Sequence, residues 1–175
     1  MDNNSLKIST LLAKLESELK QLISKRKLKN PLMIGIHNGG GWIAEKLHHR
    51  LALQEPVGII DISFYRDNFS QTETFSQVKP NLLPQQMEGR DIILIDDVFY
   101  TGRTARSALN AIFDYGRPRQ VILAVLIEQE GREVPLRPDC SGQTLLLANN
   151  ERINLTGPEP LALDIQSPDK QLTAA

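Results

Sequence analysis

The side chains best suited to chemistry lie in one short segment. An apolar run at residues 92–95 is followed by Asp96 and Asp97, and then by the sequence TGRT at 101–104. Adjacent carboxylates can accept hydrogen bonds from a sugar diol or lie near a divalent cation. At the start of a helix, free N–H groups and the helix dipole favour an anion, and Gly102 lets the backbone approach it closely. The segment therefore predicts a site for a sugar that carries both a phosphate and vicinal hydroxyls.

A purely structural explanation of these residues is an N-cap aspartate beside a surface aspartate. That explanation gives no reason for the glycine and the two threonine hydroxyls at 101–104, so we favour the binding site. The loop is not of the Walker A type, because the Gly-Lys-Ser/Thr sequence is absent.

The elements that must position this segment alternate between strand and helix patterns. Such alternation predicts an α/β domain with a central, mainly parallel sheet flanked by helices, in which ligands bind beyond the carboxyl ends of the strands. The predicted strands are residues 32–36, 57–65, 92–95 and 121–127, and the predicted helices are 8–25, 43–51 and 105–113.

A second loop is expected at the same edge of the sheet. It holds His37, Asn38 and a run of glycines at 39–41, and it also joins a strand to a helix. Glycines in such a loop can turn their N–H groups toward an anion. For His37 itself, a role in ligand binding and a purely structural role both stay open.

Two stretches lack a clear period. The polar residues 66–90 are long for a loop within a compact domain, which indicates a mobile lid, a hairpin that extends the sheet, or both. Residues 145–147 and 152–155 could form short antiparallel strands. The proline-containing segment 156–175 is expected to be a partly disordered tail.

Composition excludes several classes of protein. The 175 residues are 41% hydrophobic and carry a net charge of −1, which disfavours wholesale disorder and a strongly basic nucleic-acid binder. No signal peptide or membrane span is visible, so no association with a membrane is expected. The single cysteine, Cys140, fits a reducing cytoplasm and is not expected to be catalytic.

Residues 92–104, IILIDDVFYTGRT, resemble the signature of the type I phosphoribosyltransferases, which bind phosphoribosyl pyrophosphate (PRPP). The sequences DISFYRD at 61–67, DYGRP at 114–118 and REVPLR at 132–137 extend the similarity. Together they resemble the bacterial pyrimidine-operon attenuation regulators that double as uracil phosphoribosyltransferases. The match covers roughly residues 8–155.

The resemblance implies a type I phosphoribosyltransferase fold with one domain at residues 1–155. Within that domain it implies a flexible lid at about 66–90 and a small hood over the base at about 129–155. Mg²⁺ would arrive with PRPP, held mainly by substrate oxygens and water, and the protein itself would supply no dedicated metal site.

The resemblance also implies a role for each candidate residue. Asp96 and Asp97 would be the catalytic pair that binds the ribose hydroxyls. The 5-phosphate would be held by Thr101, Gly102, Arg103, Thr104 and Ala105, and pyrophosphate by His37, Asn38, Gly39 and Gly40. The lid would carry Tyr65, Arg66 and Asp67. The hood would present Glu128, Gln129 and Arg132 to the base.

The implied reaction converts uracil and PRPP to UMP and pyrophosphate. The resemblance further implies UMP-dependent binding to the leader RNA of a pyrimidine (pyr) operon, and a homodimer or homotetramer. Candidate RNA contacts on a basic face are Arg117, Arg119, Arg132 and Arg137.

Two short sequences depart from the family pattern. Asn38-Gly39-Gly40 stands where Thr-Arg-Gly is common, and Glu128-Gln129-Glu130 stands where Asp-Arg-Gly is usual. A cation is therefore missing at each end of the reaction. Two alternatives stay open: a catalytically weak, nucleotide-sensing regulator that binds RNA, or a phosphoribosyltransferase for another base.

Overall fold

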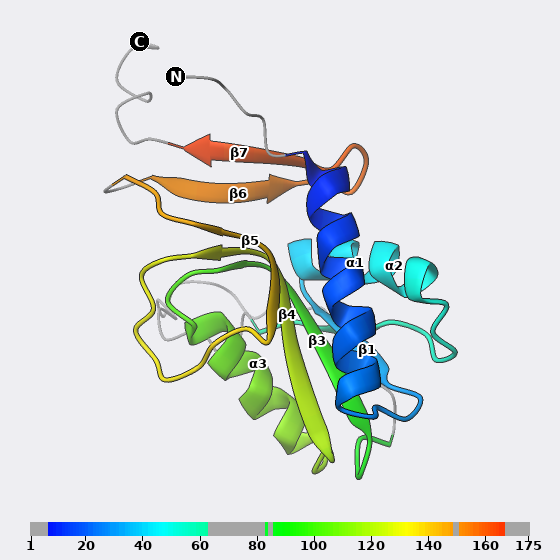
Figure 1. Cartoon of the computed structure of the whole chain (residues 1–175). Helices are drawn as coiled ribbons and strands as arrows, with labels where there is room; N and C mark the ends of the chain where they lie inside the picture. The colour runs from blue at the N-terminus through cyan, green and yellow to red at the C-terminus, as the bar shows by residue number, and fades with distance from the viewer. Residues whose placement is uncertain (1–6, 63–82, 84–85, 149–150, 167–175) are drawn as a thin grey trace.

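The computed structural model describes residues 7–62, 83, 86–148 and 151–166, which form a sheet domain and a separate hairpin (Figure 1). The helices are α1 (Ile8–Lys25), α2 (Gly39–Leu51) and α3 (Arg103–Asp114). The strands are β1 (Leu32–Ile36), β2 (Gly58–Ile60), β3 (Asp91–Phe99), β4 (Gln120–Gln129), β5 (Cys140–Leu145), β6 (Arg152–Thr156) and β7 (Ala162–Gln166). One parallel sheet has the order β2-β1-β3-β4-β5, which confirms the predicted α/β architecture.

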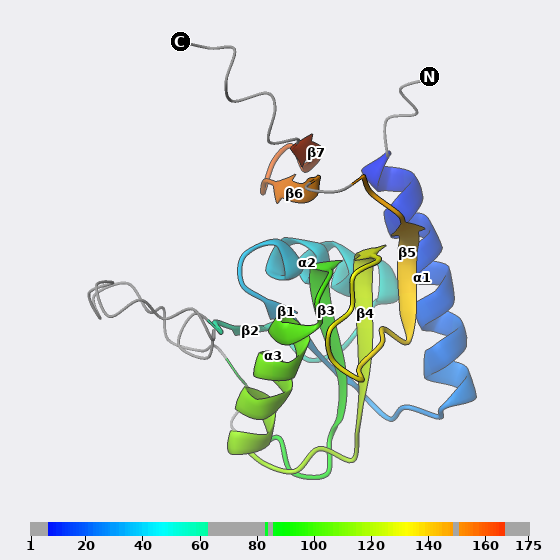
Figure 2. The same cartoon turned by 90° about the vertical axis from the view of Figure 1, so that its left-hand side faces the viewer.

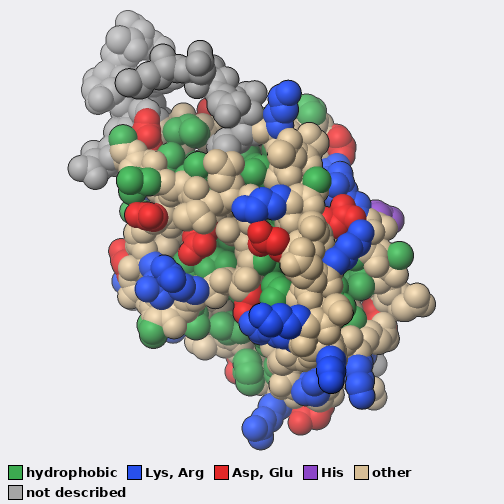
Figure 3. Space-filling view, in the orientation of Figure 1, with side chains coloured by type: hydrophobic (Ala, Val, Ile, Leu, Met, Phe, Trp, Pro, Cys, Tyr) green, Lys and Arg blue, Asp and Glu red, His purple; other side chains and the backbone are tan. Residues whose placement is uncertain are grey.

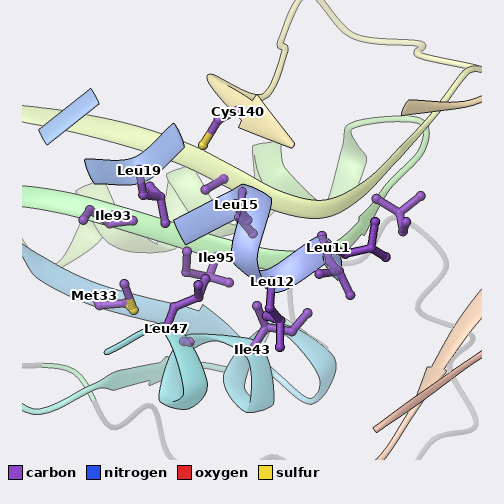
Figure 4. Close-up of a cluster of buried hydrophobic side chains, with 14 of the residues drawn as sticks. Leu11, Leu12, Leu15, Leu19, Met33, Ile43, Leu47, Ile93, Ile95 and Cys140 are labelled. Atoms are coloured by element: carbon purple, nitrogen blue, oxygen red, sulfur yellow. The ribbon is translucent and has the colours of Figure 1, made fainter. Parts of the chain in front are cut away.

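Helices cover both faces of this sheet: α1 and α2 pack on one face and α3 on the other (Figure 2). The strands alternate accordingly, since Ile93 and Ile95 of β3 pack with α1 and α2, whereas Ile92 and Leu94 pack with α3. A strand that is buried on both sides reads as an unbroken apolar run, as β3 does. Figure 4 shows the cluster under α1, whose buried residues lie on one helical face: Leu11, Leu12, Leu15 and Leu19.

The strands next to the predicted site are longer than their apolar runs. Strand β3 continues through Asp96 to Phe99, and β4 continues to Gln129. In the extended part of the two strands, Asp96 pairs with Val125 and Phe99 pairs with Glu128. Backbone groups make these pairs, so a strand can continue through polar residues beyond its apolar run. The predicted strand at 57–65 is shorter, since β2 spans only Gly58–Ile60 and residues 63–65 lie outside the described ranges.

The chain after β4 differs from the prediction. Strand β5 pairs parallel with β4 and belongs to the core sheet, although residues 140–145 were expected in a hood. The strand expected at 145–147 is therefore misplaced. The sequence did not reveal this strand, because glycine and polar residues occupy four of the six positions of CSGQTL and leave a weak apolar pattern.

The last two described strands form an antiparallel hairpin across the expected domain boundary at residue 155. Strand β7 at Ala162–Gln166 lies where a partly disordered tail was expected. The hairpin lies over the carboxyl end of the sheet in both views (Figures 1 and 2). It is anchored there because Ile153 and Leu155 are buried in the core and a Cβ on Gly157 would come within 2.7 Å of the Trp42 ring.

In the part of the chain that the structure describes, no helix combines the length and apolar character that a bilayer crossing needs.

Asp91 ties together three loops at the amino end of the sheet. Its buried carboxylate accepts hydrogen bonds from the Arg119 guanidinium, from the Lys29 N–H at 2.6 Å and from Gln120 Nε2 at 3.3 Å. Burial by itself would raise the pKa of Asp91, but these donors outweigh burial and lower the pKa below its ordinary value. The ionised carboxylate therefore stabilises the folded chain.

Asp91→Asn should lower the free energy of unfolding at pH 7 by about 1.5–3 kcal/mol, the range for hydrogen bonds to a charged group. Because the folded pKa is depressed, this stabilisation is present above the unfolded pKa of about 3.9 and is lost as pH falls through the lower folded value. Urea unfolding at pH 7 and at acidic pH should thus show the two proteins converging in acid. The exposed Glu45→Gln serves as control. A pH-independent difference would contradict this account.

The Cys140 thiol is buried between β5 and α1 (Figure 4). Burial chiefly, with help from the charges of Glu18 and Asp139, raises its pKa to about 12. Because the thiolate is the reactive form, Cys140 should resist alkylation by iodoacetamide at pH 8 in the folded protein and react in urea. Mass spectrometry of the labelled protein measures this, and rapid labelling without denaturant would show that β5 does not pack as described.

Candidate functional site

The two carboxylates of the predicted pair lie inside β3 and differ in exposure. Asp96 is 4% exposed, and its Oδ1 accepts the Asp97 N–H at 3.0 Å. Asp97 is half-buried, and its Oδ1 accepts the Val98 N–H at 2.9 Å. The prediction made no distinction between the two carboxylates, whereas in the structure Asp97 is the more accessible.

The first turn of α2 lies against Asp97. A Cβ atom on Gly39 would come within 2.2 Å of Asp97 Oδ2, and one on Gly40 would come within 2.4 Å of the Ile95 carbonyl oxygen. Glycine at these positions therefore permits an approach that no other residue could make without displacing β3. The contact brings the expected pyrophosphate loop and the acidic pair together in one place.

Helix α2 begins at Gly39, earlier than the apolar residues that predicted a helix at 43–51. Gly39 and Gly40 belong to the first turn of α2 rather than to a preceding loop, and the Asn38 carbonyl accepts the Trp42 N–H at 3.3 Å. His37 N–H donates to the Ile60 carbonyl at 2.9 Å, so this residue bridges to β2. The N–H groups of a first helical turn lack acceptors within the helix, and the helix dipole adds positive potential there.

A second helix start follows the acidic pair. Gly102 has φ +86° and precedes α3, and the Arg106 N–H donates to its carbonyl at 3.0 Å. The Arg103 N–H donates to Thr101 Oγ1 at 3.3 Å. Thr104 and Ala105 lie in the first turn. A helix start of this kind can hold a phosphate group, so the predicted 5-phosphate site stays a prediction.

Arg103 is held by a residue that the sequence analysis did not single out. Its Nε donates to Glu133 Oε2 at 2.9 Å, so its charge is paired with a carboxylate. We had expected this guanidinium beside the phosphate. Glu133 belongs to residues 130–139, which connect β4 to β5 and which we call the strap. Its only sequence signal was its place within the REVPLR similarity.

The expected base-binding residues make other contacts. Gln129, the last residue of β4, is buried, and its Nε2 reaches the Glu151 carbonyl at 3.4 Å. Arg132 is exposed, and its Nη1 lies 3.5 Å from the Leu136 carbonyl oxygen. Glu128 is half-buried on β4. These contacts point to the strap and to the base of the hairpin rather than to Asp97.

The expected lid residues Tyr65, Arg66 and Asp67 lie outside the described residues, so the lid stays a prediction. The last residues of the predicted lid range, 66–90, are nevertheless held by the core: Met87 is buried, and the Gly89 N–H donates to the Arg117 carbonyl at 2.8 Å. A lid would therefore have to end before Met87.

Comparison with known proteins identifies the family. Residues 4–158 match the model of the phosphoribosyl transferase domain. The chain belongs to this family. Among its phosphoribosyltransferase relatives is a bifunctional protein PyrR of Pseudomonas aeruginosa, 48% identical over 154 residues, which are 88% of this chain and 91% of the relative. The bifunctional protein PyrR of Nitrosococcus oceani is 48% identical over 164 residues, 93% of each chain.

Solved phosphoribosyltransferase structures share the fold. A glutamic acid mutant of an HPRT, solved to analyse an invariant aspartic acid, superimposes with a TM-score of 0.69 over 94% of each chain at 20% identity. A hypoxanthine phosphoribosyltransferase of Staphylococcus aureus gives 0.61 over 81% of this chain and 77% of that chain, at 19% identity. The predicted type I phosphoribosyltransferase fold and the enzyme class, a pentosyltransferase, are confirmed.

Gly39→Ala should weaken PRPP binding about tenfold, because the added methyl group would overlap Asp97 and overpacking costs about 1–3 kcal/mol. Gly41→Ala is the matched control in the same helical turn, since its Cβ would meet only the end of the Ile59 side chain, at 3.0 Å. Calorimetric titration with PRPP and Mg²⁺ measures both variants. Equal affinities in the two variants would contradict the described packing of α2 on β3.

Proposed function

We propose that this chain transfers the phosphoribosyl group of PRPP to uracil and releases UMP and pyrophosphate. The observation that carries the proposal is the close approach of Gly39 to the Asp97 carboxylate, four residues before the loop that begins at Thr101. PRPP has a pyrophosphate at one end of a ribose, a phosphate at the other and a diol between them. Two helix starts beside a carboxylate match those three features.

Each part of the site would act on one part of PRPP. The first-turn N–H groups of α3 and the Thr104 hydroxyl would hold the 5-phosphate, and Asp97 would accept hydrogen bonds from the ribose hydroxyls. The start of α2 would bind pyrophosphate. The N1 atom of uracil bonds to the anomeric carbon as the bond to pyrophosphate oxygen breaks, and the N1 proton passes to water or to the released pyrophosphate. The carboxylates of β3 would stabilise the positive charge that develops on the ribose.

Mg²⁺ would enter with PRPP and neutralise charge on the leaving pyrophosphate. The described residues contain no group of three or more His, Cys, Asp or Glu side chains that could hold a metal. The hard carboxylate oxygens of Asp97, next to the start of α2, fit an ion that is bound mainly by the substrate.

The proposal predicts UMP formation from uracil and PRPP. Asp97→Asn and Thr104→Ala should each raise the KM for PRPP or lower kcat/KM by about 10–100-fold, since hydrogen bonds to charged groups contribute about 1.5–3 kcal/mol. The exposed Asp164→Asn and Thr144→Ala are the matched controls. A radiochemical UMP assay measures all four variants. Absence of UMP at any protein concentration, or unchanged activity in both site variants, would overturn the proposal.

The same assay separates uracil from other bases. Gln129 stands where the family usually has an arginine near the base, and it is buried against the hairpin rather than free to reach a ligand. Hypoxanthine and guanine therefore belong in the assay beside uracil. Faster formation of a purine nucleotide would favour a transferase for another base.

A second function, UMP-dependent binding to operon leader RNA, is proposed because close relatives are named bifunctional. Basic side chains gather at the lower right of Figure 3, over the amino end of the sheet. There Arg119 pairs with Asp91 and donates to the Lys27 carbonyl at 3.3 Å. Arg132 instead lies on the strap beside the phosphate loop. The four arginines expected on one face thus fall into at least two places.

RNA binding through phosphates would weaken steeply as salt is raised, and binding no tighter than to random RNA would count against it. We also propose that the protein acts in the cytoplasm as a homodimer or homotetramer. Its one cysteine is buried as a thiol, which fits a reducing compartment. Light scattering of the full chain would determine the oligomeric state.

A further inference from the structure

We infer that Glu133 is a positioning residue for the phosphate loop: the strap holds Thr101, Gly102 and Arg103 in place from outside the site. The inference rests on the proposed function. Glu133 makes two separate contacts with the loop, one through its backbone and one through its side chain.

The backbone contact fixes the start of the loop. The Glu133 N–H donates to the Thr101 carbonyl at 2.9 Å. That bond turns the Thr101 carbonyl toward the strap. Because the C=O and N–H of a trans peptide point in opposite directions, the Gly102 N–H points away from the strap. The strap itself is anchored on the core sheet, because the Glu130 N–H donates to the Leu145 carbonyl at 3.0 Å.

The side-chain contact fixes the first residue of α3. Glu133 Oε2 accepts from Arg103 Nε at 2.9 Å, and the two side chains are 52% and 56% exposed. Such exposed pairs are individually weak. In this position, however, the pair orients Arg103, the first residue of α3, and joins its guanidinium to a carboxylate on the strap.

Packing between the strap and the loop supports the same conclusion. A Cβ on Gly102 would lie 2.5 Å from Val134 Cγ2, and a Cβ on Gly131 would lie 2.1 Å from the Tyr100 ring. Both glycines have positive φ, +86° and +136°. Residues 131–134 of the strap therefore pack closely against residues 100–102, and Glu133 lies within this contact.

A residue that positions the phosphate loop should affect PRPP and not the base. Glu133→Gln should raise the KM for PRPP about two- to fivefold, the range expected for an exposed ion pair, with kcat and the KM for uracil unchanged. Glu130→Gln, an exposed glutamate on the same strap with no described side-chain contact, is the matched control and should match the wild type.

A double-mutant cycle tests whether Glu133 acts through Arg103. Arg103→Gln should resemble Glu133→Gln, and the double variant should be no worse than either single variant. Additive effects, equality of Glu133→Gln with Glu130→Gln, or a lower KM in Glu133→Gln would each overturn the inference. The last result would make Arg103 a phosphate ligand that Glu133 restrains.

Failure of the inference can be told from failure of the proposed function. If the wild type neither binds PRPP nor forms UMP, the proposed function fails. If the wild type is active and the two glutamate variants behave alike, only the role of Glu133 fails. Thermal unfolding of each variant shows whether it is folded.

Discussion

The contact between the first turn of α2 and the carboxyl end of β3 is the constraint on which the site depends. Gly39 and Gly40 bring a helix start to within van der Waals distance of Asp97 and of the Ile95 carbonyl. The start of α3 follows the same strand on the opposite face of the sheet. Two positive helix ends thus flank one strand end that carries carboxylates, and a ligand with two anionic ends and a diol complements that pattern.

This packing explains one departure from the family pattern. An arginine is common where this chain has Gly39, and its loss removes a cation from the pyrophosphate end. In the described backbone any side chain at residue 39 would meet the Asp97 carboxylate, so the glycine and the position of Asp97 belong together. Arg103, the cation expected at the other phosphate, is paired with Glu133. Under the proposed function, binding of both anionic groups would therefore rely mainly on backbone N–H groups and helix dipoles.

The sequence predicts those elements whose structure is determined by a local pattern of residues. The helix at 8–25 has a clear helical period and agrees with α1. The strand at 32–36 is a short apolar run and agrees with β1. The segment at 101–104 has a recognisable turn chemistry. Pairing partners control the rest. Strand β5 carries a weak apolar pattern and is specified by its pairing with β4. Strand β7 is specified by its hairpin partner β6, in which the buried Leu155 pairs with Leu163. Contacts such as Glu133 with Arg103 join residues 30 apart, and no local pattern shows them.

The most direct measurement is the response of individual glycine amides to ligand in protein labelled with ¹⁵N-glycine. PRPP with Mg²⁺ should shift the resonances of Gly39, Gly40 and Gly102 together. Pyrophosphate alone should shift the first two, and ribose 5-phosphate alone should shift Gly102. Gly142, on β5, should stay in place. A PRPP titration that moves only one of the two groups, or neither, would contradict a single site formed by both helix starts.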